Sequence, residues 1–331
     1  MKAKRILGAA ATAGAAVYAG ACGLLFYEIF HRKATIPGKI FDKTNPPQTR
    51  DDVPQQDEDA QAQTDSRLEW MQAQSFREVT LQSADGKTTL KAHYLPAETQ
   101  TDHYVICAHG YRSHGRREFR LLAKYYHDRG FNILLVDHRA SGESGGALIT
   151  FGVKESADLL RWIDWVRDEC ASAQIVLHGI SMGAATVLML SDREEILPNV
   201  KYIVSDCAFT GVTDQFRSVL QKADIPSRAL IASVDVFNRL FSGFSLYDAQ
   251  PKDHVQNACV PILFTHGGGD DFVPTEMGYE NYAVCTSPKA LLIVDGAGHA
   301  RSYPTDSARY EEMLRSFEEQ YLDADAPVQA E

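Results

Sequence analysis

The five-residue segment Gly179-Ile180-Ser181-Met182-Gly183 is the feature that most constrains the fold of this chain. It follows the apolar run 174–178, which predicts a buried strand, and it leads into a helical pattern that extends to about residue 191. A serine in a sharp turn between a strand and a helix is typical of an exposed nucleophile at the edge of a sheet. Glycines on both sides allow a tight turn and a close approach of the helix to the strand. The Met182 amide, at the start of the helix, is a candidate donor to a developing oxyanion.

From about residue 67 onward the chain alternates short β-rich runs with helical patterns. Continuous apolar runs predict strands buried on both faces, and such strands separated by helices predict a mostly parallel sheet. We therefore predict an α/β fold with an eight-stranded, mostly parallel sheet flanked by helices. The predicted strands are 77–82, 88–94, 104–109, 131–137, 174–178, 202–206, 261–266 and 290–295, and the predicted helices include 116–128, 153–169 and 305–321.

The alternation is interrupted at 207–255, where two helical patterns at about 212–223 and 227–242 follow each other. The large apolar residues of this insertion are Phe237, Leu240, Phe241 and Phe244. We interpret the insertion as a short helical lid, because it precedes the strand that carries a candidate catalytic acid. The alternative is an ordinary crossover helix with additional turns.

A serine hydroxyl needs a base to remove its proton, and the base in turn needs an acid that orients it. In the order expected for a strand-turn-helix serine, the acid and then the histidine follow the nucleophile. His299 follows the last predicted strand between glycine-rich residues, and Asp270 follows the strand 261–266. Asp271, next to Asp270, and Asp206, at the end of the preceding strand, are alternative acids.

The loop after the strand 104–109 should supply the second oxyanion donor, and the Tyr111 amide is the candidate. We interpret His109 as a structural residue that supports this loop. Arg112 and His114 are equally compatible with contact to substrate and with a solvated loop.

The composition excludes several other classes of function. The formal net charge is -11 and no groove-forming cluster of Lys and Arg is evident, so nucleic acid is not an expected partner. The six cysteines are at least 15 residues apart and form no CxxC pattern, so neither a metal nor a redox cofactor is expected. Cys107 and Cys207 lie in or beside apolar runs and are expected in the core.

Residues 6–27 contain no charge, and a helix of that length would span roughly 33 Å, enough to cross a bilayer core of about 30 Å. We predict an N-terminal membrane anchor at 1–33, with the side of the membrane left open. The alternatives are a cleaved signal peptide and a lipoprotein signal ending at Cys22. We expect 34–66 to be a flexible acidic linker (or else an ordered arm), 67–321 to be the catalytic domain, and 322–331 to be a tail.

Six segments together resemble the α/β-hydrolase superfamily over about residues 67–321, and more closely the bacterial membrane-anchored, Bem46-like serine hydrolases. These segments are SADG at 83–86, CAHGYRSHG at 107–115, LLVDHRASGESGG at 134–146, HGISMG at 178–183, HGGGDDFVP at 266–274 and GAGHARSY at 296–303. The resemblance implies a triad of Ser181, Asp270 and His299 with an oxyanion role for Tyr111, and it favours Asp270 over Asp271. One departure is Ala140, at a position where relatives often carry glycine.

The sequence therefore predicts an esterase-type acyl hydrolase without cofactor, acting on a small-molecule or lipid-like acyl substrate near a membrane. A peptidase or amidase using the same triad is the first alternative, and a non-catalytic, membrane-tethered binding module is the second. The sequence does not predict the acyl length or the oligomeric state.

Overall fold

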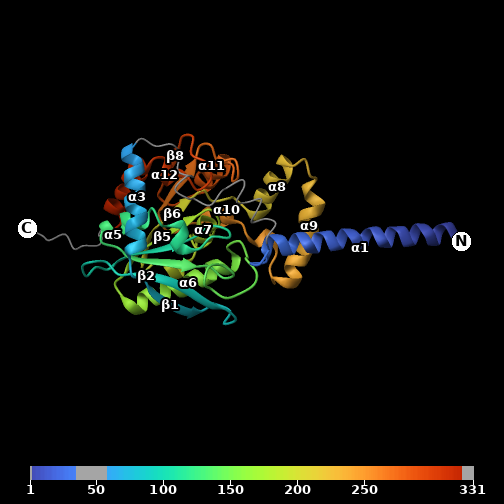
Figure 1. The fold of residues 1–331 in the computed structure, drawn as a ribbon, viewed down its shortest axis with the longest axis horizontal. Coiled ribbons are helices and arrows are strands. Elements are labelled where there is room, and N and C mark those ends of the chain that lie inside the picture. Colours follow the sequence, from blue (N-terminus) through green and yellow to red (C-terminus); the bar gives the residue numbers. More distant parts are fainter. Residues whose placement is uncertain (1, 35–57, 323–331) are drawn as a thin grey trace, which may run out of the picture.

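The uninterrupted apolar runs form the centre of an eight-stranded sheet in the computed structural model of the chain, which describes residues 2–34 and 58–322 (Figure 1). The strand order is β1-β2-β4-β3-β5-β6-β7-β8. Strand β2 pairs antiparallel with β1 and β4, and all other neighbours are parallel. The predicted fold class is confirmed. The strands are β1 (Arg77–Gln82), β2 (Thr89–Leu95), β3 (His103–Ala108), β4 (Asn132–Asp137), β5 (Gln174–Ile180), β6 (Val200–Asp206), β7 (Ile262–Gly267) and β8 (Lys289–Val294).

Helices cover both faces of the sheet, and a separate apolar cluster fills each interface (Figure 1). One face carries α6 (Val153–Glu169), α7 (Met182–Leu188), α10 (Pro251–Val255) and α11 (Thr275–Val284). The other face carries α3 (Glu58–Ala73), α5 (Ala123–Asp128) and α13 (Ser307–Tyr321). Shorter elements are α4 (Gly115–Glu118), α12 (Ser302–Thr305) and the 3-10 turns η2 (Glu194–Ile196) and η3 (Leu246–Asp248). Helix α11 was not among the predicted elements.

The predicted helix 116–128 is interrupted between α4 and α5. Phe119, Leu121 and Leu122 lie in the interruption and are all buried in the same apolar cluster. In a continuous helix Phe119 and Leu122, three positions apart, would share a face and Leu121 would point away from it, so the break allows all three to reach the core.

The prediction of a flexible linker is wrong for residues 58–66, which form the first half of α3. The helix is rich in Ala, Glu and Gln, which have high helix propensity. Its later turns attach it to the domain, since Met71 is buried and Arg67 forms an ion pair with Glu311 of α13 at 2.7 Å. Residues 35–57 of the predicted linker and residues 323–331 of the predicted tail lie outside the described residues.

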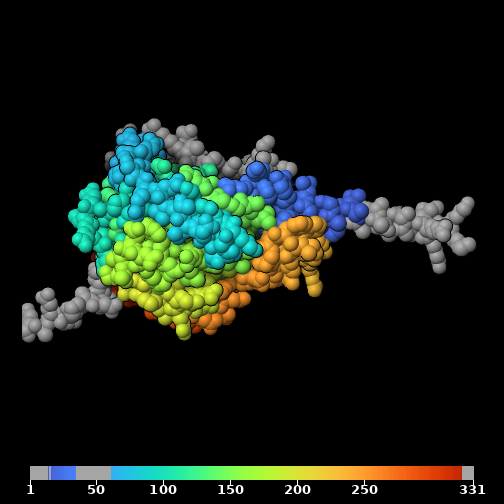
Figure 2. Space-filling view, turned by 90° about the horizontal axis from the view of Figure 1, so that it is seen from below, coloured from blue at the N-terminus to red at the C-terminus, as the bar shows by residue number. Residues whose placement is uncertain are grey.

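The insertion forms two helices, α8 (Val212–Lys222) and α9 (Ser227–Phe241), at one end of the molecule (Figure 1). The N-terminal helix α1 (Lys2–Phe30) extends from the same end and packs against α9. Figure 2 shows the blue surface of α1 directly beside the orange surface of the insertion. Phe26 stacks between Phe30 and Phe237, with ring centroids 5.0 and 6.4 Å away.

Within the described residues, no single helix has both the length and the apolar composition needed to cross a membrane. Ala16–Phe30 is a shorter apolar helix, and Ser227–Phe241 with Leu246–Val255 meets the criteria only as a pair bent by 93°. The membrane anchor stays a prediction.

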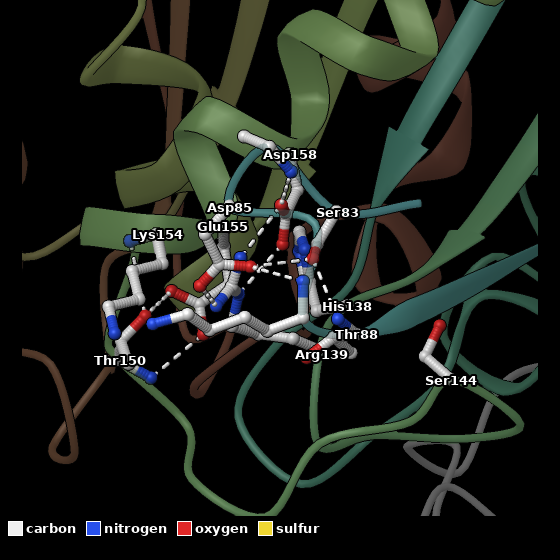
Figure 3. A network of polar contacts seen from close by, with 12 residues as sticks. Ser83, Asp85, Thr88, His138, Arg139, Ser144, Thr150, Lys154, Glu155 and Asp158 are labelled. Atoms are coloured by element: carbon white, nitrogen blue, oxygen red, sulfur yellow. Dashed lines mark hydrogen bonds and ion pairs between the residues drawn. The ribbon is translucent and has the colours of Figure 1, made fainter. Parts of the chain in front are cut away.

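Ion pairs fix the turn after β4 (Figure 3). Arg139 donates two hydrogen bonds to Asp158 of α6, at 2.7 and 2.8 Å, and its third nitrogen lies 3.3 Å from Asp85. Burial disfavours the charged guanidinium, but Asp158 outweighs this effect and raises the pKa of Arg139. Ala140 has a left-handed φ of 57° and still donates its amide to Gly145, so the turn forms without the glycine that relatives often have there.

Candidate active site

Ser181 occupies a strained turn between β5 and α7. Its φ of 57° and ψ of -117° are unusual for a residue with a side chain and are typical of a nucleophile held at a strand-to-helix turn. A Cβ on Gly183 would lie 1.9 Å from the carbonyl oxygen of Ala108, and one on Gly179 would lie 2.3 Å from the carbonyl oxygen of Gly183. Both glycines are therefore required by the close approach of α7 to β5 and β3.

Three side chains from three strand ends are hydrogen-bonded in series, and we call Ser181, His299 and Asp270 the candidate triad. Ser181 Oγ lies 2.8 Å from His299 Nε2, and His299 Nδ1 lies 2.8 Å from Asp270 Oδ2. All three residues are buried. The imidazole can thus accept the serine proton on one nitrogen while the carboxylate holds the other nitrogen protonated.

The two alternative acids do not reach His299. Asp271 is exposed. Asp206 accepts hydrogen bonds from Ser302 Oγ and the Tyr310 hydroxyl, both at 3.1 Å. Burial raises the pKa of Asp206 to about 6. Its hydrogen-bond partners, rather than its charge, separate it from His299.

Asp270 is held in the ionised state. Burial works against its charge, but His299 and His266 together hold its pKa well below the usual range. Its second oxygen, Oδ1, accepts the amides of Phe272 and Val273, each at 2.9 Å. Two backbone donors and a histidine therefore fix the carboxylate in one orientation.

His266 was not singled out in the sequence. Its Nε2 donates to the Val273 carbonyl at 3.0 Å and lies 3.3 Å from Asp270 Oδ2, so Asp270 lies between two histidines. Burial lowers the pKa of His266, but Asp270 outweighs it and raises the pKa overall. His266 stands four residues before the acid at the end of the same strand, but this spacing alone does not mark it as a neighbour of the carboxylate.

Both candidate oxyanion donors lie beside Ser181. A Cβ on Gly110 would lie 3.3 Å from the Ser181 Cβ, which brings the loop of Tyr111 into contact with the nucleophile. Met182 is the first residue of α7, so its amide has no acceptor one turn earlier in the helix. His109 lies beneath this loop, where Nδ1 lies 2.7 Å from the Gly110 carbonyl and Nε2 accepts the His138 amide at 3.0 Å. The structural role predicted for His109 agrees with these contacts.

The structure does not direct Arg112 and His114 toward the candidate triad. His114 accepts the Arg117 amide and begins α4. Arg112 donates to backbone carbonyls at the end of α1.

An apolar cluster surrounds the nucleophile on the side of the insertion. It joins Met182 to residues of α1, of the insertion and of the segment before α6, among them Phe26, Phe30, Phe151, Phe209, Ile231, Val234 and Phe244. The residue that follows the nucleophile is therefore packed in an apolar environment. The contribution of α1 to this cluster was not expected from the sequence.

Cys107 and Cys207 are fully buried, as predicted. Cys207 lies close to the candidate triad, since ligand atoms of Cys207, Asp270 and His299 are all within 4.8 Å of one another. Burial, with the nearby Asp206 and Asp270, holds the pKa of the Cys207 thiol well above its usual value, so the thiol stays protonated beside the candidate triad. The hydrogen bonds of the candidate triad already account for the other two side chains.

Comparison with known proteins gives the same fold. A family model described as alpha/beta hydrolase fold matches residues 104–223. YqkD of Bacillus subtilis is 27% identical over 226 residues, which cover 68% of this chain and 73% of that protein. Human ABHD12B is 27% identical over 191 residues, covering 54% of this chain and 49% of that protein. Among solved structures, the esterase Pf2001 of Pyrococcus furiosus superposes with a TM-score of 0.59 at 22% identity, covering 75% of this chain and 92% of the esterase.

Proposed function

Because the chain belongs to the α/β-hydrolase superfamily and its Ser181, His299 and Asp270 are hydrogen-bonded in series, we propose that it is a serine hydrolase that cleaves carboxylic esters or thioesters. The observation that carries the proposal is the pair of 2.8 Å hydrogen bonds that places His299 between the hydroxyl and the carboxylate. A complete series of this kind, buried and with an ionised acid, has a direct use in acyl transfer and little use in a binding module.

In the proposed reaction, Ser181 Oγ attacks the acyl carbon while His299 Nε2 takes its proton. The amides of Tyr111 and Met182 donate to the oxyanion of the tetrahedral intermediate. His299 then gives the proton to the leaving alcohol or thiol, and Asp270 stabilises the imidazolium in between. Water enters after the leaving group and hydrolyses the acyl-enzyme with His299 again as the base.

We further propose a hydrophobic acyl substrate, taken from or near a membrane. The apolar cluster around Met182 supports the first part. For the second part, most exposed large apolar side chains of the described residues lie on α1 or on the insertion: Val17, Tyr18, Leu24, Tyr27, Val219, Ile225, Val236, Leu240, Phe241 and Tyr247. Apolar surface concentrated at one end of a protein is typical of a contact with lipid or another protein.

A fluorophosphonate probe tests the nucleophile directly. It should label the wild type and fail to label Ser181→Ala, whereas Ser191→Ala, which removes another buried serine hydroxyl, should be labelled like the wild type. Labelling of Ser181→Ala at the wild-type rate would exclude Ser181 as the nucleophile.

The substrate class is tested with p-nitrophenyl esters of increasing acyl length, matched thioesters and aminoacyl anilides. We expect kcat/KM to rise with acyl length for esters or thioesters and anilide turnover to be slower. Faster turnover of the anilides would instead favour a peptidase.

A further inference from the structure

The end of α1 is joined to the oxyanion loop by side chains of that loop. Arg112 donates to three backbone carbonyls, through Nη2 to Glu28 at 2.7 Å and His31 at 3.1 Å, and through Nη1 to Ala34 at 2.8 Å. Its Nε donates to the Tyr111 hydroxyl at 2.7 Å, and that hydroxyl donates to the Ile29 carbonyl at 2.5 Å. We call these hydrogen bonds the α1 junction.

The α1 junction matches the chemistry of a helix end. The last carbonyls of a helix have no partners within it and carry partial negative charge, which a guanidinium with several donors can satisfy at once. Burial raises the pKa of Tyr111, so its hydroxyl is neutral and can both accept from Arg112 and donate to Ile29. Each side chain of the junction thus has a partner at the end of α1.

The same contacts hold a strained backbone next to the candidate oxyanion donor. Arg112 has a φ of 57°, a left-handed conformation that is unfavourable for a residue with a side chain and persists only when its surroundings enforce it. The residue before it is Tyr111, whose amide is the candidate donor. Tyr111 also stacks on Phe151 at 5.3 Å, and Phe151 packs edge-on against Phe30 of α1 at 5.4 Å.

We propose that Arg112 is a positioning residue, which binds the end of α1 and thereby holds the Tyr111 amide in the orientation needed for the oxyanion. This inference deepens the proposed function and rests on it. Helix α1 is then a working part of the hydrolase in addition to any role in localisation. Loss of the junction lets the strained loop relax, so the oxyanion loses one of its two donors for part of the time.

The full-length chain offers matched variants. Arg112→Ala removes every hydrogen bond of the α1 junction that Arg112 donates and leaves the one from Tyr111 to Ile29. Arg112→Lys keeps the charge but loses the planar set of donors. Arg32→Ala removes a comparable set of hydrogen bonds between the end of α1 and the domain, because Arg32 donates to the carbonyls of Gly142, Ser144 and Gly146 rather than to the oxyanion loop. Lys33→Ala removes an exposed charge from the same segment.

Three quantities are measured: the rate of fluorophosphonate labelling, kcat and KM for an ester, and deuterium uptake of the 105–118 segment. For Arg112→Ala we expect labelling and kcat to fall by about tenfold or more, since a fully lost oxyanion donor costs about 10²–10³ in kcat. KM should change little, deuterium uptake should rise, and Arg112→Lys should lie between Arg112→Ala and the wild type. Arg32→Ala and Lys33→Ala should keep kcat within about threefold of the wild type, as expected for changes outside the donor set.

Equal kcat and equal uptake in Arg112→Ala and Arg32→Ala would overturn the proposal, because the junction would then serve stability alone. If Arg112→Ala does not fold, the comparison of Arg112→Lys with Arg32→Ala decides the question in the same way. Failure of the proposed function can be distinguished from failure of the Arg112 proposal, because the wild type would then show neither labelling nor ester turnover. The uptake of the 105–118 segment still reports on the junction in that case.

Discussion

Replacing Asp270 with asparagine tests the assignment of the catalytic acid, because the surrounding donors decide which way the amide must face. In the wild type, Oδ1 accepts two backbone amides, from Phe272 and Val273, and Oδ2 faces His299 Nδ1. An asparagine that keeps its oxygen toward the two amides must turn its NH₂ group toward His299. The opposite orientation would place the NH₂ group against two N–H donors, which is the less favourable choice.

The expected loss of activity follows from this orientation. With an NH₂ group at the Oδ2 position, His299 Nδ1 must become the acceptor, so its proton moves to Nε2 and points at Ser181. The imidazole can then no longer accept the serine proton. We expect kcat to fall by about 10⁴-fold, the size of effect that a wrong histidine tautomer produces in a serine triad, or about 5 kcal/mol in activation free energy.

The assay compares kcat for an ester substrate in Asp270→Asn, Asp271→Asn and Asp206→Asn, with the amount of folded protein determined by circular dichroism. Asp271 is exposed and should be replaceable with a change within about threefold. Asp206 has its partners in Ser302 and Tyr310, so its loss should affect stability more than kcat. If Asp270→Asn kept more than about a tenth of the wild-type kcat, an effect far below that of a wrong tautomer, the assignment would be refuted.

Three further predictions concern stability. Gly183→Ala places a Cβ 1.9 Å from the Ala108 carbonyl oxygen, and separating α7 from β3 should cost at least about 3 kcal/mol in urea denaturation. Asp158→Ala leaves Arg139 buried without its main partner and should cost about 3–5 kcal/mol. The pKa of Asp206 is raised to about 6 from an unfolded value near 3.8. Its contribution to the free energy of unfolding is therefore fully present below pH 4 and is lost as the pH rises through 6. In Asp206→Asn, the decrease in the free energy of unfolding between pH 4 and pH 6 should therefore be smaller than in the wild type, by up to about 3 kcal/mol.

Matched control variants separate these effects from a general sensitivity of the fold to substitution. Gly20→Ala lies in open space on α1 and should not destabilise the chain. Asp164→Ala breaks two surface ion pairs, with Arg161 and with Arg167, and should cost less than about 1 kcal/mol. Parallel pH profiles for Asp206→Asn and the wild type would show that Asp206 does not titrate as described.

The sheet was predictable because its information is local. Strands such as β4 are buried along their whole length, so their sequences are continuous apolar runs, and every predicted strand lies within one or two residues of an observed one. The grouping of Ser181, Asp270 and His299 could also be predicted, because parallel strands with crossover helices place their ends along one edge of the sheet. Knowing that three polar residues follow three such strands is enough to bring them together.

Helix α3 and the role of His266 could not be predicted from the sequence, and the physical reason is common to both. The first turns of α3 are polar and show no apolar period, and the helix is attached by a few later contacts such as Arg67 with Glu311. His266 is adjacent to Asp270 only because the chain folds back between them, with the Val273 carbonyl as a shared neighbour. Neither contact leaves a periodic pattern in the sequence.

For the N-terminal helix, the apolar run seen in the sequence is not enough to predict what the helix packs against. Its apolar residues predict removal from water, but the sequence cannot distinguish burial in lipid from burial in protein, since both remove the same surface. In the described part of α1, Cys22, Phe26 and Phe30 recur at every fourth position and are buried in protein. Val17 and Leu24, on the remaining surface, are 74% and 59% exposed. Helix α1 therefore packs on the hydrolase with one face and keeps an apolar face beside the insertion, which is the arrangement expected if the enzyme meets a lipid surface there.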